Sequence, residues 1–280
     1  MLRPSPIPSR LAKRLILCLL LSVLCGSQWL SVSAKPPPPC ETEAGKIVRS
    51  TVPSFVYGRP IPVSVYLPPC YADEWSSVFP VIYLLHGGGA DETQWPDLNV
   101  QVSADALIGH GRPPFVVIMP GGAYSDPLDY DAFVMKDLIP AVQSQYRVQG
   151  FRAGRVIGGL SLGGYWALRI AFLHPDRFAA VGGYSPVTNL GYPQDPLSLA
   201  RHADVETFYG LHIALDVGDK DSLAYDTKQI AQVLGARGIT VSLTIGRGGH
   251  FREYWRAHTY EYFRYFSDIS ALSQDATPPQ

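Results

Sequence analysis

Short apolar runs alternate with polar, glycine-containing stretches along most of this chain. Eight runs have strand character, and from residue 81 onward most of them are short and continuously apolar. Such runs are typical of strands that are covered on both faces of a sheet. The first two runs alternate more strongly between apolar and polar residues, which predicts antiparallel edge strands exposed on one side. The predicted strands are 46–52, 61–67, 81–85, 115–119, 155–159, 178–184, 212–218 and 240–245.

Longer segments with apolar residues at helical spacing lie between and after these runs. Pro140 predicts a kink in the first segment, and His174-Pro175 predicts the end of the second. The alternation of strands and helices predicts an α/β fold, with a mostly parallel central sheet and helices on both of its faces. The predicted helices are 131–146, 164–178, 224–238 and 252–266.

The first 34 residues have the layout of a secretory signal. Four basic residues precede the apolar run 15–26, and Val32-Ser33-Ala34 offers a small-residue cleavage site. The apolar run is shorter than the roughly 20 residues that a membrane-spanning helix needs. We therefore expect cleavage after Ala34, no stable membrane anchor, and a secreted or periplasmic protein that starts with a proline-rich leader over 35–44.

Removal of this signal changes the charge and the cysteine count. The whole chain has 23 basic and 24 acidic residues, and the signal takes away four basic and no acidic ones, which leaves a net charge of −5. Cys18 and Cys25 leave with the signal, whereas Cys40 and Cys70 remain. Two cysteines in an oxidising compartment predict one disulfide, and two free buried thiols are the alternative.

Several classes of function are disfavoured by what the sequence lacks. No lysine- or arginine-rich run follows the first 14 residues, and no GxxxxGK[ST] loop is present, so neither nucleic acid nor nucleotide is an expected partner. The chain has no HExxH motif and no clustered ligands, so we expect no metal and no cofactor.

The stretch "RVIGGLSLGGYWAL" (155–168) places one serine at a predicted strand-to-helix junction. Gly159-Leu160-Ser161-Leu162-Gly163 matches G-x-S-x-G, in which the serine occupies a sharp, strained turn. Side chains two positions before or after it would collide with the neighbouring strand and helix, and glycine removes these collisions. The pattern predicts that the Ser161 hydroxyl is exposed above the strand end, where the helix N-terminus favours developing negative charge.

A serine nucleophile needs a base and an orienting carboxylate. Among seven histidines, His250 alone follows the last predicted strand on a glycine-rich loop before the final helix. Asp219 and Asp221 both lie at the end of strand 212–218, where catalytic groups gather in open α/β sheets, whereas Asp216 lies within that strand. The residues by themselves leave Asp219 and Asp221 as equal candidates.

An oxyanion in such a reaction is stabilised by backbone amides. The amide of Leu162 follows the serine directly. A second donor is expected from the loop after strand 81–85, because the glycines of "HGGG" (86–89) let backbone N–H groups approach a substrate.

With these motifs in this order, residues 45–266 resemble α/β-hydrolases of the esterase D and feruloyl esterase type. The resemblance rests on "VYLPPCYADEWSSVFPVIYLLHGGGADETQW", "GGLSLGGYWALRIAFLHPDRFAAVGGYSP", "GDKDSL" and "GGHFREYWR". It implies that Asp221, directly before "SL", is the acid, and that Gly88 and Leu162 form the oxyanion hole. It also implies an α/β-hydrolase catalytic domain over 45–268, and the polar end of the chain predicts a flexible tail at 269–280.

The resemblance leads us to expect a secreted serine carboxylic-ester hydrolase that forms an acyl-enzyme on Ser161. Feruloyl, acetylxylan and siderophore esterases belong to this family, so the expected substrate is a small-molecule or polysaccharide-linked ester. Trp95 and Tyr184 are candidates for contacting an aromatic acyl group, and residues 185–210 for a cap over the site. The alternatives are an acyltransferase of the mycolyltransferase type and a non-catalytic carbohydrate-binding module on a hydrolase scaffold.

Overall fold

The computed structural model of the chain describes residues 44–69, 71, 78–122 and 127–275. All of them belong to one unit of the chain. The predicted signal over 1–34, nearly all of the leader, and both Cys40 and Cys70 lie outside the described residues. Among the residues that are described, no helix is both long and apolar enough to cross a membrane.

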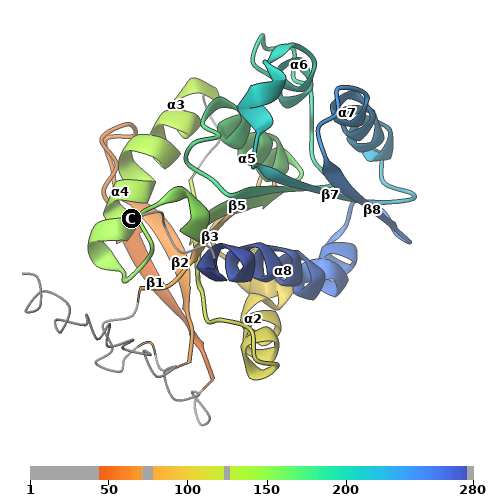
Figure 1. Cartoon of the computed structure of the whole chain (residues 1–280). Helices are drawn as coiled ribbons and strands as arrows, with labels where there is room; N and C mark the ends of the chain where they lie inside the picture. Colours follow the sequence, from red (N-terminus) through yellow and green to blue (C-terminus); the bar gives the residue numbers. More distant parts are fainter. Residues whose placement is uncertain (1–43, 70, 72–77, 123–126, 276–280) are drawn as a thin grey trace, which may run out of the picture. The chain divides into compact units, whose positions relative to one another are not determined.

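Eight strands form one sheet in the order β1-β2-β4-β3-β5-β6-β7-β8 (Figure 1). The β1–β2 and β2–β4 pairs are antiparallel, and every other neighbouring pair is parallel. The predicted mostly parallel sheet is therefore confirmed. The strands are β1 (Lys46–Val52), β2 (Ile61–Leu67), β3 (Val81–Leu85), β4 (Val116–Pro120), β5 (Arg155–Leu160), β6 (Ala180–Tyr184), β7 (His212–Gly218) and β8 (Val241–Gly246).

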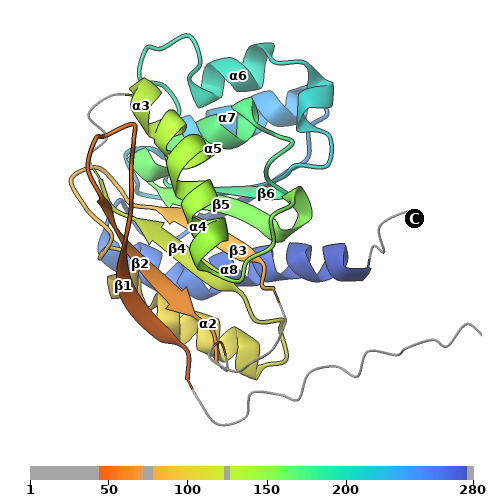
Figure 2. The ribbon, with the colours of Figure 1, turned by 90° about the vertical axis from the view of Figure 1, so that its left-hand side faces the viewer.

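Helices cover both faces of this sheet, as predicted. In Figure 2, α2 and α8 lie on one side of the strands, and α3 to α7 lie on the other. The α-helices are α2 (Val100–Gly109), α3 (Pro127–Ala132), α4 (Ile139–Gln145), α5 (Leu162–Leu173), α6 (Pro196–His202), α7 (Ala224–Ala236) and α8 (Arg252–Asp275). Short 3₁₀ turns are η1 (Pro96–Leu98), η3 (Arg152–Gly154) and η4 (Val205–Phe208), and η2 (Phe133–Leu138) is a π-helical segment.

The two helix layers bury two separate apolar clusters against the sheet. Along β3, Val81, Tyr83 and Leu85 join the cluster under α5, whereas Ile82 and Leu84 join the cluster under α8. Successive side chains of a strand point to opposite faces, so a strand between two helix layers must be apolar at every position. This is the physical reason for the unbroken apolar run 81–85.

The structure corrects the expectations about strand 61–67 and about the end of the last helix, and it adds detail at β8 and Pro140. Strand β2 lies inside the sheet, and β8 forms the second edge, with four of its six residues exposed. Pro140 lies in the first turn of α4, directly after the π-helical segment. Proline has no backbone N–H to donate, and it stands where the backbone hydrogen bonds change from the π to the α pattern. The last helix was predicted to end at residue 266, but α8 continues to Asp275, into the segment expected to be a tail.

Two helices lie where the sequence pattern indicated none. Helix α2 packs against α8, and α6 packs against α5 and α7. The segment 185–210, considered as a cap, thus carries a helix that belongs to the layer over the sheet.

Candidate active site

Ser161 lies in a strained turn between β5 and α5. Its φ of 52° and ψ of −113° fall in a region that residues other than glycine rarely adopt. A Cβ on Gly159 would overlap the backbone of Gly163, and a Cβ on Gly163 would overlap the carbonyls of Leu85 and His86. The two glycines of G-x-S-x-G are therefore required by backbone contacts, as the sequence predicts.

The backbone of the turn is held on both sides of the serine. The Ser161 N–H donates to Tyr184 O of the neighbouring strand at 2.9 Å, and Ser161 O accepts from the amides of Tyr165 and Val187 at 3.1 Å each. These bonds fix the conformation that the strained dihedrals demand, so the hydroxyl keeps one position above the sheet.

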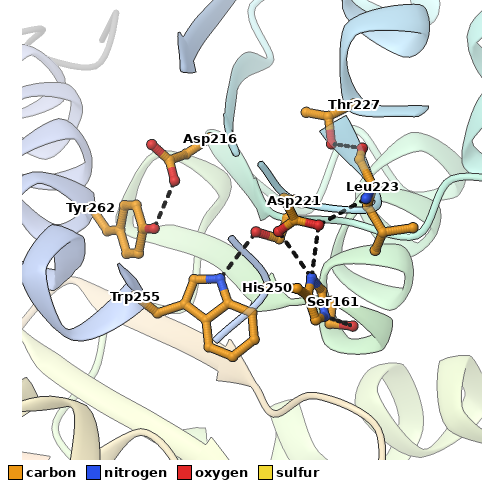
Figure 3. Close-up of polar contacts among 9 residues, drawn as sticks. Ser161, Asp216, Asp221, Leu223, Thr227, His250, Trp255 and Tyr262 are labelled. Atoms are coloured by element: carbon orange, nitrogen blue, oxygen red, sulfur yellow. Dashed lines mark hydrogen bonds and ion pairs between the residues drawn. The ribbon is translucent and has the colours of Figure 1, made fainter. Parts of the chain in front are cut away.

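His250 stands on the loop between β8 and α8, and its ring reaches the serine. Its Nε2 lies 2.9 Å from Ser161 Oγ although 89 residues separate the two in sequence. Figure 3 shows the imidazole between Ser161 and Asp221, with its two nitrogens facing opposite partners. The side chain is 31% exposed, so the base faces a region that substrate can enter.

Asp221 holds the other nitrogen of this imidazole. Nδ1 of His250 lies 3.0 Å from Oδ2 and 3.1 Å from Oδ1 of Asp221, and the aspartate side chain is fully buried. Oδ1 also accepts the Leu223 N–H at 2.8 Å, and the Thr227 hydroxyl donates to Leu223 O at 2.9 Å. A carboxylate can only accept, so Nδ1 carries the proton and Nε2 is left to accept the serine proton.

The structure separates the two aspartates that the residues alone left equal. Asp219 turns to the next loop instead, where its Oδ1 accepts the Gly248 N–H at 2.9 Å and its own amide donates to Gly246 O at 2.7 Å. The amide of Lys220 donates to Gly248 O at 2.7 Å. These contacts join the loops after β7 and β8, and this junction brings Asp221 and His250 together.

Asp216 lies within β7, earlier in the chain than Asp219 and Asp221, and it is buried. Its Oδ1 accepts the Tyr262 hydroxyl at 2.9 Å, as Figure 3 shows. Burial raises the pKa of Asp216 above its usual range, and the Tyr262 hydrogen bond opposes this shift. The carboxylate faces α8 rather than His250, so it takes no part in the three-residue arrangement.

The loop after β3 lies beside the start of α5. A Cβ on Gly88 would come within 3.6 Å of the Leu162 side chain, so the two predicted oxyanion donors belong to adjoining segments. Leu162 is the first residue of α5, where an N–H has no acceptor within the helix. Within the described ranges, no hydrogen bond to another backbone group uses the Gly88 amide.

Three side chains hold this loop, and of these only Gln94 was not singled out by the sequence patterns. Gln94 Oε1 accepts the Gly87 N–H at 2.7 Å, and Trp95 Nε1 donates to Leu85 O at 3.0 Å. His86 lies in hydrogen-bond range of Gly87 O and Gly122 O, and burial lowers its pKa, which favours the neutral ring.

Two aromatic residues differ from expectation. Trp95 and Tyr184, considered as contacts for an aromatic acyl group, are each only 1% exposed and belong to the core under α8. Trp255 contacts the site instead, because its indole meets the His250 ring edge-on at a centroid distance of 4.9 Å. Its Nε1 donates to the buried Ser185 hydroxyl at 3.1 Å. Trp255 lies within the "GGHFREYWR" stretch, but the sequence assigned it no role, since only the packing of α8 brings it to the imidazole.

Cavities lie both beside and away from these residues. One of about 290 Å³ is lined by Gln94, Arg252 and Trp255, next to the loop after β3. Another cavity, of about 630 Å³, lies at the starts of β7 and β8, which are the strand ends opposite the site. It is not lined by Ser161, Asp221 or His250. Among the described residues there is no group of three or more side chains that could hold a metal ion.

Solved structures that are similar in fold include esterases and other serine hydrolases. A "ferulic acid esterase" aligns with a TM-score of 0.75 and 24% identity, over 81% of this chain and 98% of that one. A Staphylococcus aureus fluorophosphonate-binding serine hydrolase, FphF, aligns with a TM-score of 0.71 and 20% identity, over 80% and 99%. At these identities the likeness shows the α/β-hydrolase fold.

Similar sequences among known proteins include esterases. "Esterase Rv1288" of Mycobacterium tuberculosis is 29% identical over 139 residues, which are 46% of this chain and 29% of that protein. An "Endo-1,4-beta-xylanase/feruloyl esterase" of Xylanibacter ruminicola is 30% identical over 156 residues, 49% of this chain and 21% of that one. The chain thus aligns with less than a third of the length of these relatives.

A family match covers the whole arrangement of motifs. The family described as "Putative esterase" matches residues 54–266, a span that includes the loop after β3, the serine turn, and the loops after β7 and β8. The chain therefore belongs to this esterase family of α/β-hydrolases.

Proposed function

We propose that the protein is a secreted serine carboxylic-ester hydrolase that works through an acyl-enzyme on Ser161. The observation that carries this proposal is the continuous path from Ser161 Oγ through His250 to Asp221, with donor–acceptor distances of 2.9 Å and 3.0 Å. A hydroxyl at neutral pH needs such a base to become a nucleophile.

Acylation begins when His250 Nε2 takes the hydroxyl proton of Ser161 while Oγ attacks the ester carbonyl carbon. The carbonyl π electrons move to oxygen, and the resulting oxyanion accepts hydrogen bonds from the amides of Gly88 and Leu162. The Asp221 carboxylate stabilises the imidazolium that forms. His250 Nε2–H then protonates the leaving alkoxide oxygen, so the ester C–O bond breaks, the alcohol departs, and the acyl group stays on Oγ.

Deacylation repeats these steps with water. His250 Nε2 accepts a water proton as the water oxygen attacks the acyl carbon, and the same two amides stabilise the second oxyanion. The proton then passes from Nε2 to Ser161 Oγ as the C–O bond to the serine breaks. The products are a carboxylic acid and the free enzyme.

For the substrate, we propose a feruloyl, acetylxylan or siderophore-type ester. The Xylanibacter ruminicola relative, named for both xylanase and feruloyl esterase activity, supports an ester that is linked to a polysaccharide. Solved neighbours of the same fold include a feruloyl esterase module from Clostridium thermocellum complexed with sinapinate. Comparing kcat/KM on feruloyl, acetylated xylan and siderophore esters tests this choice: one of the three should exceed the other two at least tenfold, and equally low values on all three would contradict the proposal.

The chemistry is tested by labelling and turnover. The mature protein should react with a fluorophosphonate and hydrolyse p-nitrophenyl acetate, and Ser161→Ala should abolish both while the thermal unfolding transition is retained. A labelled Ser161→Ala protein, or one that still hydrolyses the ester, would refute the assignment. Adding a carbohydrate acceptor distinguishes hydrolysis from acyl transfer, because transfer yields a new ester and hydrolysis a free acid.

Secretion and the disulfide are proposals that rest on the residues alone. The charged start, the apolar run and Ala34 support export with cleavage after residue 34, so the exported protein should begin at Lys35. Intact-mass analysis of the exported protein under non-reducing conditions tests both ideas. A Cys40–Cys70 bond lowers the mass by two hydrogens and blocks alkylation of the two thiols.

A further inference from the structure

The cavity of about 290 Å³ borders the proposed reaction centre on two sides. One wall is Ala90, two residues past the Gly88 amide, and another wall is Trp255, whose ring contacts His250. Figure 3 shows Trp255 directly beside the His250 imidazole. A group bound in this cavity would thus lie beside the loop after β3 and against Trp255, the residue that contacts His250, with room for about one ring.

Gln94 contributes a side chain of defined orientation to this cavity. Its Oε1 accepts the Gly87 N–H at 2.7 Å, and only the oxygen of a glutamine amide can accept a hydrogen bond. The Nε2 group therefore takes no part in the hydrogen bond to Gly87. In the ranges that the structure describes, Nε2 has no hydrogen-bond partner, so its N–H groups remain available to a ligand in the cavity that Gln94 lines.

The three charged side chains that line the cavity, Asp91, Asp97 and Arg252, all have hydrogen-bond or ion-pair partners. Arg252 contacts the Asp97 carboxylate at 3.3 Å and its backbone carbonyl at 3.2 Å. Asp91 Oδ1 accepts the Thr93 amide at 2.9 Å and the Thr93 hydroxyl at 2.6 Å. Arg252 is half exposed and has further N–H groups. The cavity therefore offers hydrogen-bond donors without a strong excess of either charge, which suits neutral rings that carry oxygen acceptors.

We propose that this cavity is a substrate subsite for a hydroxylated or methoxylated ring of the ester, and that Gln94 is its positioning and specificity-determining residue. The proposal rests on the esterase function above. One end of the Gln94 amide holds the loop that carries the Gly88 donor, and the other end binds a ring oxygen. Occupation of the subsite then stiffens the oxyanion loop, so the ring contributes to kcat as well as to KM.

Two substitutions separate the two ends of the amide. Gln94→Glu keeps an acceptor for the Gly87 N–H but replaces the donor with a carboxylate oxygen. Gln94→Leu removes both. The matched control is Gln145→Leu, at the exposed end of α4 away from the site. Substrates are p-nitrophenyl acetate, which carries no ring in its acyl group, methyl ferulate, and an acetylated xylo-oligosaccharide.

We expect Gln94→Glu to lower the ratio of kcat/KM for one ring-bearing ester to that for p-nitrophenyl acetate at least tenfold. Gln94→Leu should in addition lower kcat on p-nitrophenyl acetate by about tenfold, because Gly87 loses its acceptor. The ester that shows the larger fall in this ratio identifies the ring as aromatic or sugar. An unchanged ratio for both ring-bearing esters in Gln94→Glu would overturn the subsite.

A binding measurement keeps this test separate from the proposed chemistry. Calorimetry on Ser161→Ala protein should detect methyl ferulate or the xylo-oligosaccharide, and adding Gln94→Glu should weaken that binding at least fivefold. Equal binding in both proteins would overturn the role of Gln94. Failure of the wild type to label with fluorophosphonate would instead refute the esterase function, whatever the calorimetry shows.

Discussion

Replacing Asp221 with asparagine tests the charge of the third residue while keeping its shape. The Leu223 N–H, 2.8 Å from Oδ1, requires an acceptor, so the asparagine oxygen should keep this position. The asparagine NH₂ then takes the place of Oδ2, 3.0 Å from His250 Nδ1. The oxygen, 3.1 Å from Nδ1, is already engaged by the Leu223 N–H, so the NH₂ group favours Nδ1 as an acceptor and the imidazole proton on Nε2.

The change of tautomer affects turnover because the other ring nitrogen of His250, Nε2, faces the Ser161 hydroxyl. With the proton on Nε2, the atom 2.9 Å from Ser161 Oγ no longer accepts the hydroxyl proton. A triad with the wrong tautomer loses about 10⁴-fold in kcat, or about 5 kcal/mol of transition-state stabilisation. We expect this loss in kcat on p-nitrophenyl acetate for Asp221→Asn, with the thermal unfolding transition retained because the buried side chain keeps its volume and its Leu223 contact.

The matched variant is Asp219→Asn, two residues earlier on the same loop. Its amide oxygen can still accept the Gly248 N–H, so kcat should fall by less than about tenfold. Steady-state kinetics of both purified variants at the pH optimum of the wild type decide the matter. An Asp221→Asn enzyme within tenfold of wild type, or an Asp219→Asn enzyme that is the weaker of the two, would refute the reasoning.

Three further predictions concern strain, packing and ionisation. Since Ser161 has a φ of 52°, Ser161→Gly should be more stable than Ser161→Ala by about 1 kcal/mol in urea unfolding, and equal stability would contradict strain at this turn. Gly163→Ala should lower the free energy of unfolding by about 3 kcal/mol, because its Cβ overlaps the carbonyl of His86; an unchanged urea midpoint would contradict this backbone contact. Burial raises the pKa of Asp216, so the wild type loses stability as the pH rises from the unfolded-state pKa through the folded-state pKa. Asp216→Asn cannot ionise and can still accept the Tyr262 hydroxyl, so its stability relative to wild type should rise as the pH increases above the ordinary aspartate value of 3.8; a difference that stays constant with pH would refute burial as the cause of the raised pKa.

The strands and the serine turn could be predicted from short stretches of sequence because they depend on contacts of neighbouring residues. A strand covered on two faces is apolar at every position, so the run 81–85 marks β3 without further information. The glycines at 159 and 163 mark the turn because a side chain at either position would collide with backbone a few residues away or at the end of the adjacent strand. Helix α2 was missed because its polar positions, such as Gln101 and Ser103, break a simple apolar spacing.

The arrangement around Ser161 depends on contacts between distant segments. Asp219 and Asp221 are equivalent in local sequence, and the loop after β8 separates them by binding one through Gly248 and presenting His250 to the other. Trp255 and Gln94 gain their roles only where α8 and the loop after β3 pack beside the sheet end.

The chain by itself thus determined which segments form the sheet, where the nucleophile turn lies, and which residue types were available for catalysis, because these properties follow from side-chain period and backbone sterics over short distances. Tertiary structure decided which aspartate faces the imidazole, that Trp95 is core rather than a substrate contact, and that Gln94 links a cavity to the oxyanion loop. These properties depend on hydrogen-bond directions across elements far apart in sequence, and such directions exist only once the strands are paired and the helices are packed against them.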